Sequence, residues 1–158
     1  MAKKKGGKKP DPQGKILVKN RRARYEFEIL DSYEAGLVLL GTEVKSLREG
    51  KASLEESYLR FQQGELWWIK GNIMEFKHSG PFLNHDPRRR RKLLMRKSQL
   101  RKLASQVGQK GLTLVPLDIH VTLTGLIKME LGLCRGKNVH DKRQTEKRRQ
   151  DRREITSY

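Results

Sequence analysis

The sequence predicts a small, mainly β domain, a closed or partly open antiparallel β-barrel, with a basic segment at each end of the chain. Short apolar stretches that alternate with polar residues are typical of half-buried strands, and turn residues separate them at short intervals. The chain has 158 residues, enough for one ordinary domain. We therefore expect one ordered domain over residues 20–134, between a disordered segment at 1–19 and a tail at 135–158.

The first ordered elements are expected just after the N-terminal segment. Residues 1–19 are rich in Lys, Gly and Pro and contain little that could be buried, so they are interpreted as disordered. Residues 23–30 alternate between apolar and charged side chains, which predicts a strand. A second strand is predicted over 33–40, where Gly36 indicates a bulge or a close approach of two backbones.

A short helix and a hairpin are predicted next. In residues 41–50, Thr42 is the candidate N-cap, and a glycine at the end is a stop signal. Two apolar stretches at 57–61 and 66–73 flank turn residues that include Gly64, which predicts a β-hairpin.

The segment from Arg88 to Val107 carries the densest positive charge of the chain. Residues 88–102 contain nine Lys and Arg and no acid. Apolar residues at helical spacing predict a helix with one apolar and one cationic face, although Ser98 could also cap a shorter helix. Two further strands are predicted after it, at 112–123, with Pro116 at an edge or a bulge, and at 126–134.

Charge points to a polyanionic partner. Lys and Arg number 36 against 18 Asp and Glu, a formal charge of +18, and the excess lies in the two termini and in residues 88–102. Basic tails with one basic face are typical of nucleic-acid-binding proteins, although any one of these segments could be a solvated charge run. No apolar stretch reaches the roughly 18 residues of a membrane span, and the N-terminus lacks a signal peptide. We expect a cytoplasmic protein that binds no membrane.

Residues suited to catalysis or to metal binding are scarce. The four histidines lack a metal-ligand spacing, and Cys134 alone can form neither an internal disulfide nor a multi-cysteine zinc site, so it is interpreted as a small buried hydrophobe. Of Trp67 and Trp68, which point to opposite faces of one strand, at most one is expected in the core. We expect no cofactor, no metal and no enzymatic activity.

Several motifs resemble the small protein B family over about residues 20–150. They are GTEVKSLR at 41–48, HDPRRRRKLL at 85–94 and GKNVHDKR at 136–143. The resemblance implies a six-stranded antiparallel barrel related to the oligonucleotide-binding fold, with short helices outside. It also implies a non-enzymatic protein that binds the tRNA-like domain of transfer-messenger RNA, promotes its alanylation and brings it to stalled ribosomes for trans-translation.

Candidate RNA-binding residues follow from the motifs and from the charge. By resemblance, Glu34, Leu94 and Arg96 match RNA-binding positions, although Arg96 stands where a polar residue such as Asn is common. The remaining RNA-binding candidates are the cations that could contact phosphates: Arg21, Arg22, Arg24, Arg89, Arg91 and Lys92. The tail motif contributes four residues implied to act at the ribosomal decoding site: His140, Asp141, Lys142 and Arg143.

Three classes of function stay open at this point. The first is the RNA-binding rescue factor, with transfer-messenger RNA and the small ribosomal subunit with its mRNA channel as partners, and alanyl-tRNA synthetase and elongation factor Tu as indirect ones. The second is a generic ribosome-associated structural protein, which composition alone would favour. The third is an enzyme that modifies or cleaves RNA, for which no active-site residues are found. We expect a monomer whose tail is disordered when free and helical on the ribosome.

Overall fold

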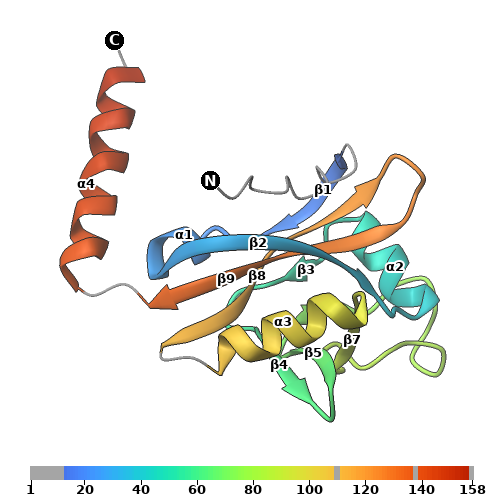
Figure 1. The fold of residues 1–158 in the computed structure, drawn as a ribbon. Coiled ribbons are helices and arrows are strands. Elements are labelled where there is room, and N and C mark those ends of the chain that lie inside the picture. The colour runs from blue at the N-terminus through green and yellow to red at the C-terminus, as the bar shows by residue number, and fades with distance from the viewer. Residues whose placement is uncertain (1–12, 109–110, 137–138, 157–158) are drawn as a thin grey trace.

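The computed structural model describes residues 13–108, 111–136 and 139–156 (Figure 1). The strands are β1 Gln13–Lys19, β2 Phe27–Leu37, β3 Ala52–Ser53, β4 Tyr58–Gln62, β5 Glu65–Ile69, β6 Asn72–Ile73, β7 Arg91–Leu94, β8 Leu112–Thr122 and β9 Ile127–Gly136. The helices are α1 Ala23–Glu26, α2 Gly41–Arg48, α3 Lys97–Val107 and α4 Val139–Thr156.

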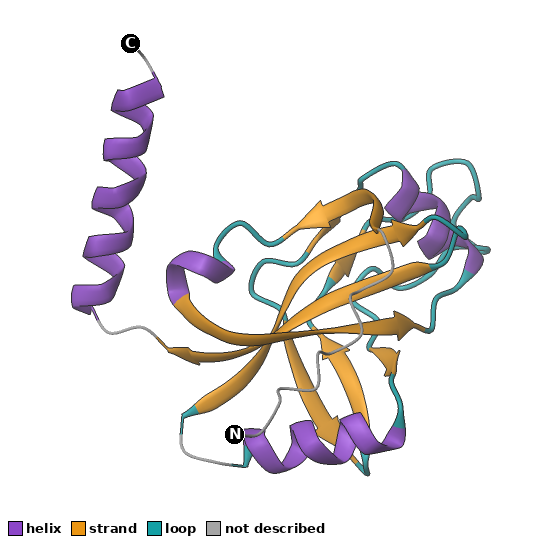
Figure 2. Ribbon diagram, turned by 45° about the horizontal axis from the view of Figure 1, so that its top comes forward, coloured by secondary structure: helices purple, strands orange, loops and turns teal. Residues whose placement is uncertain are grey.

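Seven of these strands form one antiparallel sheet in the order β1-β8-β9-β2-β7-β5-β4, and β3 pairs with β6 separately. The mainly β, antiparallel class is confirmed, but the six-stranded barrel implied by the resemblance is corrected: over the described ranges the main sheet has seven strands and does not close. Across the described residues β1 and β4 occupy opposite edges and do not pair with each other, so the sheet is strongly curved but open (Figure 2). The sequence signal fails here because alternation locates strands and says nothing of which edges meet.

Two local predictions are confirmed by the strand register. Residues 58–62 and 65–69 pair as a hairpin whose turn residues Gln63 and Gly64 both have positive φ, 51° and 74°. This backbone matches the turns that suit the twist of a two-residue hairpin. In the β8–β9 pair the register shifts between Pro116 and Asp118, so Pro116 lies at a bulge, where its missing N–H is tolerated.

Order begins earlier than expected at the N-terminus. Residues 13–19, expected to be disordered, form β1 and pair with β8, and Val18 is buried. The short apolar stretch at 16–18 supplies the side chains that this edge strand packs, which a composition average over nineteen residues conceals. Residues 1–12 of the expected disordered segment lie outside the described residues.

Three other element boundaries differ from the predictions. The two strands predicted at 23–30 and 33–40 are the helical turn α1 followed by the single strand β2. The helix predicted from residue 88 starts only at Lys97, because residues 91–94 form β7 between β2 and β5. Helix α2 starts at Gly41, and its N-terminus is capped by the Glu43 carboxylate, which accepts from the Leu40 N–H at 2.8 Å, rather than by Thr42.

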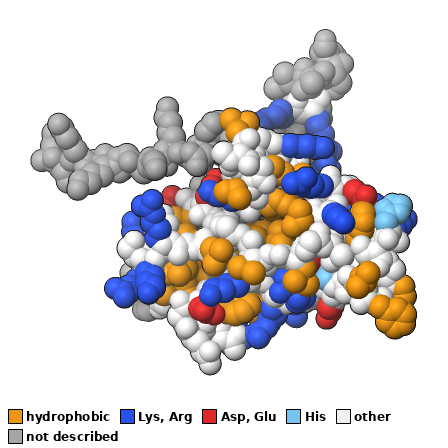
Figure 3. Space-filling model, turned by 90° about the vertical axis from the view of Figure 1, so that its right-hand side faces the viewer, with side chains coloured by type: hydrophobic (Ala, Val, Ile, Leu, Met, Phe, Trp, Pro, Cys, Tyr) orange, Lys and Arg blue, Asp and Glu red, His pale blue; other side chains and the backbone are white. Residues whose placement is uncertain are grey.

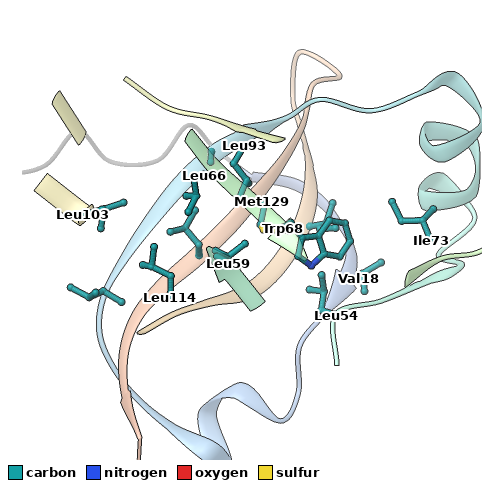
Figure 4. Packing of buried hydrophobic residues seen from close by; sticks show 14 of the residues in the cluster. Val18, Leu54, Leu59, Leu66, Trp68, Ile73, Leu93, Leu103, Leu114 and Met129 are labelled. Carbon is teal, nitrogen blue, oxygen red and sulfur yellow. The ribbon is translucent and has the colours of Figure 1, made fainter. Parts of the chain in front are cut away.

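The core fills the concave side of the sheet. Trp68, Leu66 and Leu93 come from β5 and β7, and they lie in one cluster with Met129 of β9 (Figure 4). Ile119 of β8 belongs to the same cluster. Helix α3 closes one end with Leu103, which is fully buried. A Cβ at Gly71 would lie 2.0 Å from the Trp68 indole, so only glycine fits beside this ring.

The tail helix α4 projects from the sheet on the side of α1, with which it is in contact (Figure 1). It is strongly polar, and its described side chains are exposed, whereas α2 and α3 each bury a leucine. No helix in the described ranges is long and apolar enough to cross a membrane.

Candidate nucleic-acid interface

The three positions implied by the family motifs converge at one end of the sheet. Strand β2 pairs with β7 so that Gly36 lies opposite Leu94, and a Cβ at Gly36 would be 3.4 Å from the Leu94 Cβ. Glu34 lies two residues before Gly36, on the same face of β2. Arg96 follows β7 directly and is the N-cap residue of α3. The glycine thus lets two strands approach closely beneath the candidate site.

The surface around this point combines apolar and basic side chains. Leu94 is 52% exposed, and Val38 and Leu40, which follow β2, are 43% and 48% exposed. Figure 3 shows hydrophobic and Lys/Arg side chains interleaved on the face that the ends of α2 and α3 border, with few acidic ones. Arginine forks bind phosphates, and apolar or aromatic surfaces accept stacked bases, so the combination suits RNA.

Glu34 is an exception to this positive surface, and its charge is neutralised from two sides. Lys128 Nζ donates to Oε1 at 2.9 Å, and His120 Nε2 donates to Oε2 at 3.2 Å. Partial burial raises the pKa of Glu34, but the hydrogen bonds from Lys128 and His120 outweigh it and the pKa falls below its usual value. The carboxylate therefore stays ionised without presenting a bare negative charge to RNA.

Arg91 is a correction to the predicted phosphate contacts. Its side chain is completely buried, its Nε donates to Glu43, and Nη1 donates to the Gly71 carbonyl at 3.0 Å. Arg89 donates to the other oxygen of Glu43 at 2.5 Å and is one-third exposed. Because Glu43 is fully buried, these ion pairs hold α2 against β7, and loss of either partner would leave a buried charge unpaired; Arg91 cannot contact RNA in this fold.

The other cations of this segment are accessible. Arg90 lies over the Trp67 ring, 5.3 Å from its centroid, and Lys92 pairs with Glu65 at 2.7 Å. Trp67 is half-buried on the outer face, whereas Trp68 is fully buried, which confirms that only one of the two belongs to the core. Because consecutive residues of a strand point to opposite faces, the sequence alone was sufficient to predict that the two rings lie on opposite sides of the sheet.

A second basic region lies at the opposite end of β2. Arg21, Arg22 and Arg24 belong to α1 and the turn before it, so the structure does not bring them to Glu34. A hollow of about 820 Å³ is lined there by Lys19, Asn20, Arg21, Arg24, Arg149, Arg152 and Arg153. His140, Asp141, Lys142 and Arg143 lie in the first half of α4, away from the Glu34 end.

The remaining chemical candidates have structural roles. His85 is buried; its Nε2–H donates to the Ile73 carbonyl at 2.9 Å, and its Nδ1 lies 2.8 Å from the Thr42 hydroxyl oxygen. Cys134 is buried as predicted, and burial raises the pKa of its thiol to about 11. Within the described parts of the chain, no group of three or more His, Cys, Asp and Glu side chains is placed to hold a metal ion.

Sequence reasoning missed three residues that shape the site: His120, Lys128 and Glu43. His120 and Lys128 lie in alternating strands, where a polar residue looks like an ordinary solvent-facing position until the partner strand is known. One signal was present: the sole acid within GTEVKSLR, Glu43, has the spacing from Leu40 of a helix-capping Glu.

The curved antiparallel sheet and the interleaved basic and apolar surface define a nucleic-acid-binding domain. The chain belongs to the SmpB family, since the family model described as SmpB protein matches residues 17–158. The SsrA-binding protein of Thermosynechococcus vestitus is 52% identical over 141 residues, which cover 89% of this chain and 92% of that protein. The SsrA-binding protein of Agrobacterium fabrum is 51% identical over 135 residues, 85% of this chain and 84% of that protein.

A solved structure is also similar. It is described as "tmRNA-SmpB: a journey to the center of the bacterial ribosome", and its matching chain is 50% identical, with a TM-score of 0.66. The match covers 79% of this chain and 87% of that one.

Proposed function

We propose that this protein binds the tRNA-like domain of transfer-messenger RNA, promotes its alanylation and brings it to stalled ribosomes for trans-translation. The observation that carries the proposal is the family match over residues 17–158, joined to relatives at about half identity that are named for binding SsrA. The similar structure, which names tmRNA, SmpB and the ribosome together, supports the same partners.

The proposed RNA surface comprises Glu34, Leu94 and Arg96 with the accessible cations around them. Leu94 offers an apolar contact, Arg96 a phosphate contact, and Glu34 a fixed hydrogen-bond acceptor. Arg89 and Lys92 add positive potential beside this surface, and Arg21, Arg22 and Arg24 do so at the other end of β2. The protein acts by binding and not by catalysis, as a monomer that meets alanyl-tRNA synthetase and elongation factor Tu through the RNA.

The tail is proposed to act on the ribosome rather than on the delivered RNA. His140, Asp141, Lys142 and Arg143 would reach the decoding site, with the rest of α4 in the vacant mRNA channel. Activity at the ribosome would place the protein in the cytoplasm.

Recovery of bound RNA from cells tests this function. The tagged full-length protein is purified at moderate salt, and the RNA that stays bound is sequenced. We expect transfer-messenger RNA to be strongly enriched over bulk tRNA and ribosomal RNA. Enrichment of ribosomal RNA alone would favour the generic ribosome-associated protein, and turnover of an added RNA would favour an enzyme.

A further inference from the structure

A strip of charged side chains crosses three neighbouring strands beside Glu34. In register, Asp118 of β8 lies opposite Glu130 of β9, and Glu130 lies opposite Glu34 of β2. Two pairs further along, His120 of β8 lies opposite Lys128 of β9. The core residues Ile119 and Met129 alternate with these positions, so the strip occupies the face away from the core.

His120 lies between two carboxylates within this strip. Its Nδ1 is 2.7 Å from Asp118 Oδ1, its Nε2 is 3.2 Å from Glu34 Oε2, and the side chain is fully buried. Carboxylates only accept hydrogen bonds when ionised, so both contacts require both ring nitrogens to carry a proton. The imidazolium form satisfies them, and the two carboxylates offset the cost of burying its charge.

The other groups that face the strip complete the charge balance. Lys128 pairs with Glu34, and Glu130 interacts with Asp118 and with Ser32. Burial raises the pKa of Glu130, and its hydrogen bond to Asp118 and the charge of Asp118 raise it further. Glu130 therefore adds less negative charge to the strip than an ordinary glutamate would.

We propose that His120, held by Asp118, is a positioning residue that fixes the Glu34 carboxylate so that Glu34 accepts a hydrogen bond from a donor on the RNA. The inference rests on the proposed function. Each carboxylate oxygen has more than one acceptor site, and Lys128 and His120 use one on each oxygen. Glu34 keeps 18% of its side chain exposed, which leaves acceptor sites open to solvent.

The donor is an exocyclic amine of a base or a ribose 2′-hydroxyl. Both donate to a carboxylate, whereas a phosphate oxygen cannot, so Glu34 repels any RNA placed with a phosphate at this point. His120 therefore contributes to the choice of RNA as well as to affinity, because a freely rotating carboxylate would select donors less sharply.

A double-mutant cycle tests the inference. The full-length protein and its Glu34→Ala, His120→Gln and combined variants are titrated with a transcript of the tRNA-like domain. Loss of a charge-assisted hydrogen bond weakens binding by about tenfold or more, so we expect that loss for Glu34→Ala and a several-fold loss for His120→Gln. In the Glu34→Ala background, His120→Gln should have no further effect.

Two further measurements separate positioning from folding. Asp118→Asn keeps the side-chain shape but removes the charge that holds His120, and it should reproduce part of the loss while the protein stays folded. The ¹⁵N signals of the His120 ring should show protons on both nitrogens in the free protein.

Tight binding by a transcript with 2′-deoxy substitutions would assign the donor to a base, and weakened binding would assign it to the ribose.

Three results would overturn the inference: additive losses in the cycle, unchanged binding by His120→Gln, or unchanged binding by Glu34→Ala. The proposed function fails separately, if the unmodified protein does not prefer the tRNA-like transcript to bulk tRNA.

Discussion

At the scale of single residues, the ion pairs of Glu43 determine which cations of the basic segment 88–102 are buried and which stay exposed to solvent. Glu43 accepts from Arg89, Arg91 and the Leu40 N–H, so the same carboxylate caps α2 and holds β7 against it. Removing one partner of a buried pair leaves the other charge unpaired in a medium of low polarity, which costs more than the pair itself contributes.

Arg91→Met should therefore destabilise the protein severely. We expect a loss of about 3–5 kcal/mol in the free energy of unfolding, because Glu43 loses its buried partner. Urea denaturation followed by circular dichroism measures it. Arg88→Met is the matched control, since Arg88 is exposed and its loss should change stability by less than about 0.5 kcal/mol. Equal effects of the two substitutions would refute the structural role of Arg91.

The same carboxylate predicts a pH dependence of stability. Burial raises the pKa of Glu43, but the hydrogen bonds from Arg89, Leu40 and Arg91 outweigh it, so the folded pKa is below the unfolded value. The contribution of Glu43 is then fully present above the unfolded pKa, roughly 4.3, and is lost as the pH falls through the folded pKa.

The stability difference between the unmodified protein and Glu43→Gln should consequently be largest near neutral pH and should shrink towards pH 3. Urea midpoints across this range give the comparison. A difference independent of pH would mean that the ionised carboxylate is not what stabilises this junction.

At the scale of elements, the strands were predicted better than their connections. Alternation located the β4–β5 hairpin, the bulged strand at Pro116 and the opposite orientation of Trp67 and Trp68, because each depends on nearest neighbours along one chain. The helix predicted from residue 88 failed because Leu93 is buried by strands β2 and β5, both distant in sequence. Tertiary pairing overrode a local helical pattern there.

In the candidate site, the residues that match the family motifs were predicted, but the side chains that hold them in place were not. Glu34 and Leu94 could be singled out by resemblance, but His120 and Lys128 reach Glu34 only through the β8–β9–β2 register. Runs of cations likewise cannot show that Arg91 is buried while Arg90 is exposed, since that distinction depends on which face of β7 meets the core.

Helix α3 carries a testable share of the electrostatic attraction. Its apolar side packs through Leu103, while Lys97, Arg101 and Lys102 are exposed. Replacing these three cations with Gln should weaken binding of the tRNA-like RNA. The slope of log affinity against log salt should fall by roughly 0.7–0.9 for each phosphate that the variant no longer neutralises.

The control variant removes three exposed cations elsewhere, Lys15, Arg60 and Lys70, at equal net charge. Equal slopes for the two variants would show that α3 contributes only overall charge and no localised contact.

At the scale of the whole molecule, the sheet separates two basic ends. The Glu34 end holds the proposed RNA surface, and the α1 end holds the tail helix. Helix α4 spans 18 residues, about 27 Å at 1.5 Å per residue. Its Arg148–Arg152 and Arg149–Arg153 pairs are like charges at a spacing of four, so the isolated helix is marginal in water and RNA phosphates would stabilise it.

Removal of the tail should thus separate RNA binding from ribosome rescue. The cut is placed after Gly136, because β9 extends to that residue and pairs with Phe27. We expect the truncated protein to bind the tRNA-like RNA almost normally and to support no peptide tagging in cells. Amide exchange should be fast over 143–153 in the free protein. Normal peptide tagging without the tail, or strong amide protection of α4 in the free protein, would contradict the separate roles of the domain and the tail.

The central claim is that the Glu34 end recognises one tRNA-like RNA and not polyanions in general. Competition binding measures this most directly: a labelled transcript of the tRNA-like domain is bound to the full-length protein at moderate salt and displaced by bulk tRNA or by the unlabelled transcript. We expect bulk tRNA to compete at least about tenfold less well, the equivalent of one oriented hydrogen bond. Equal competition by both RNAs would contradict the claim.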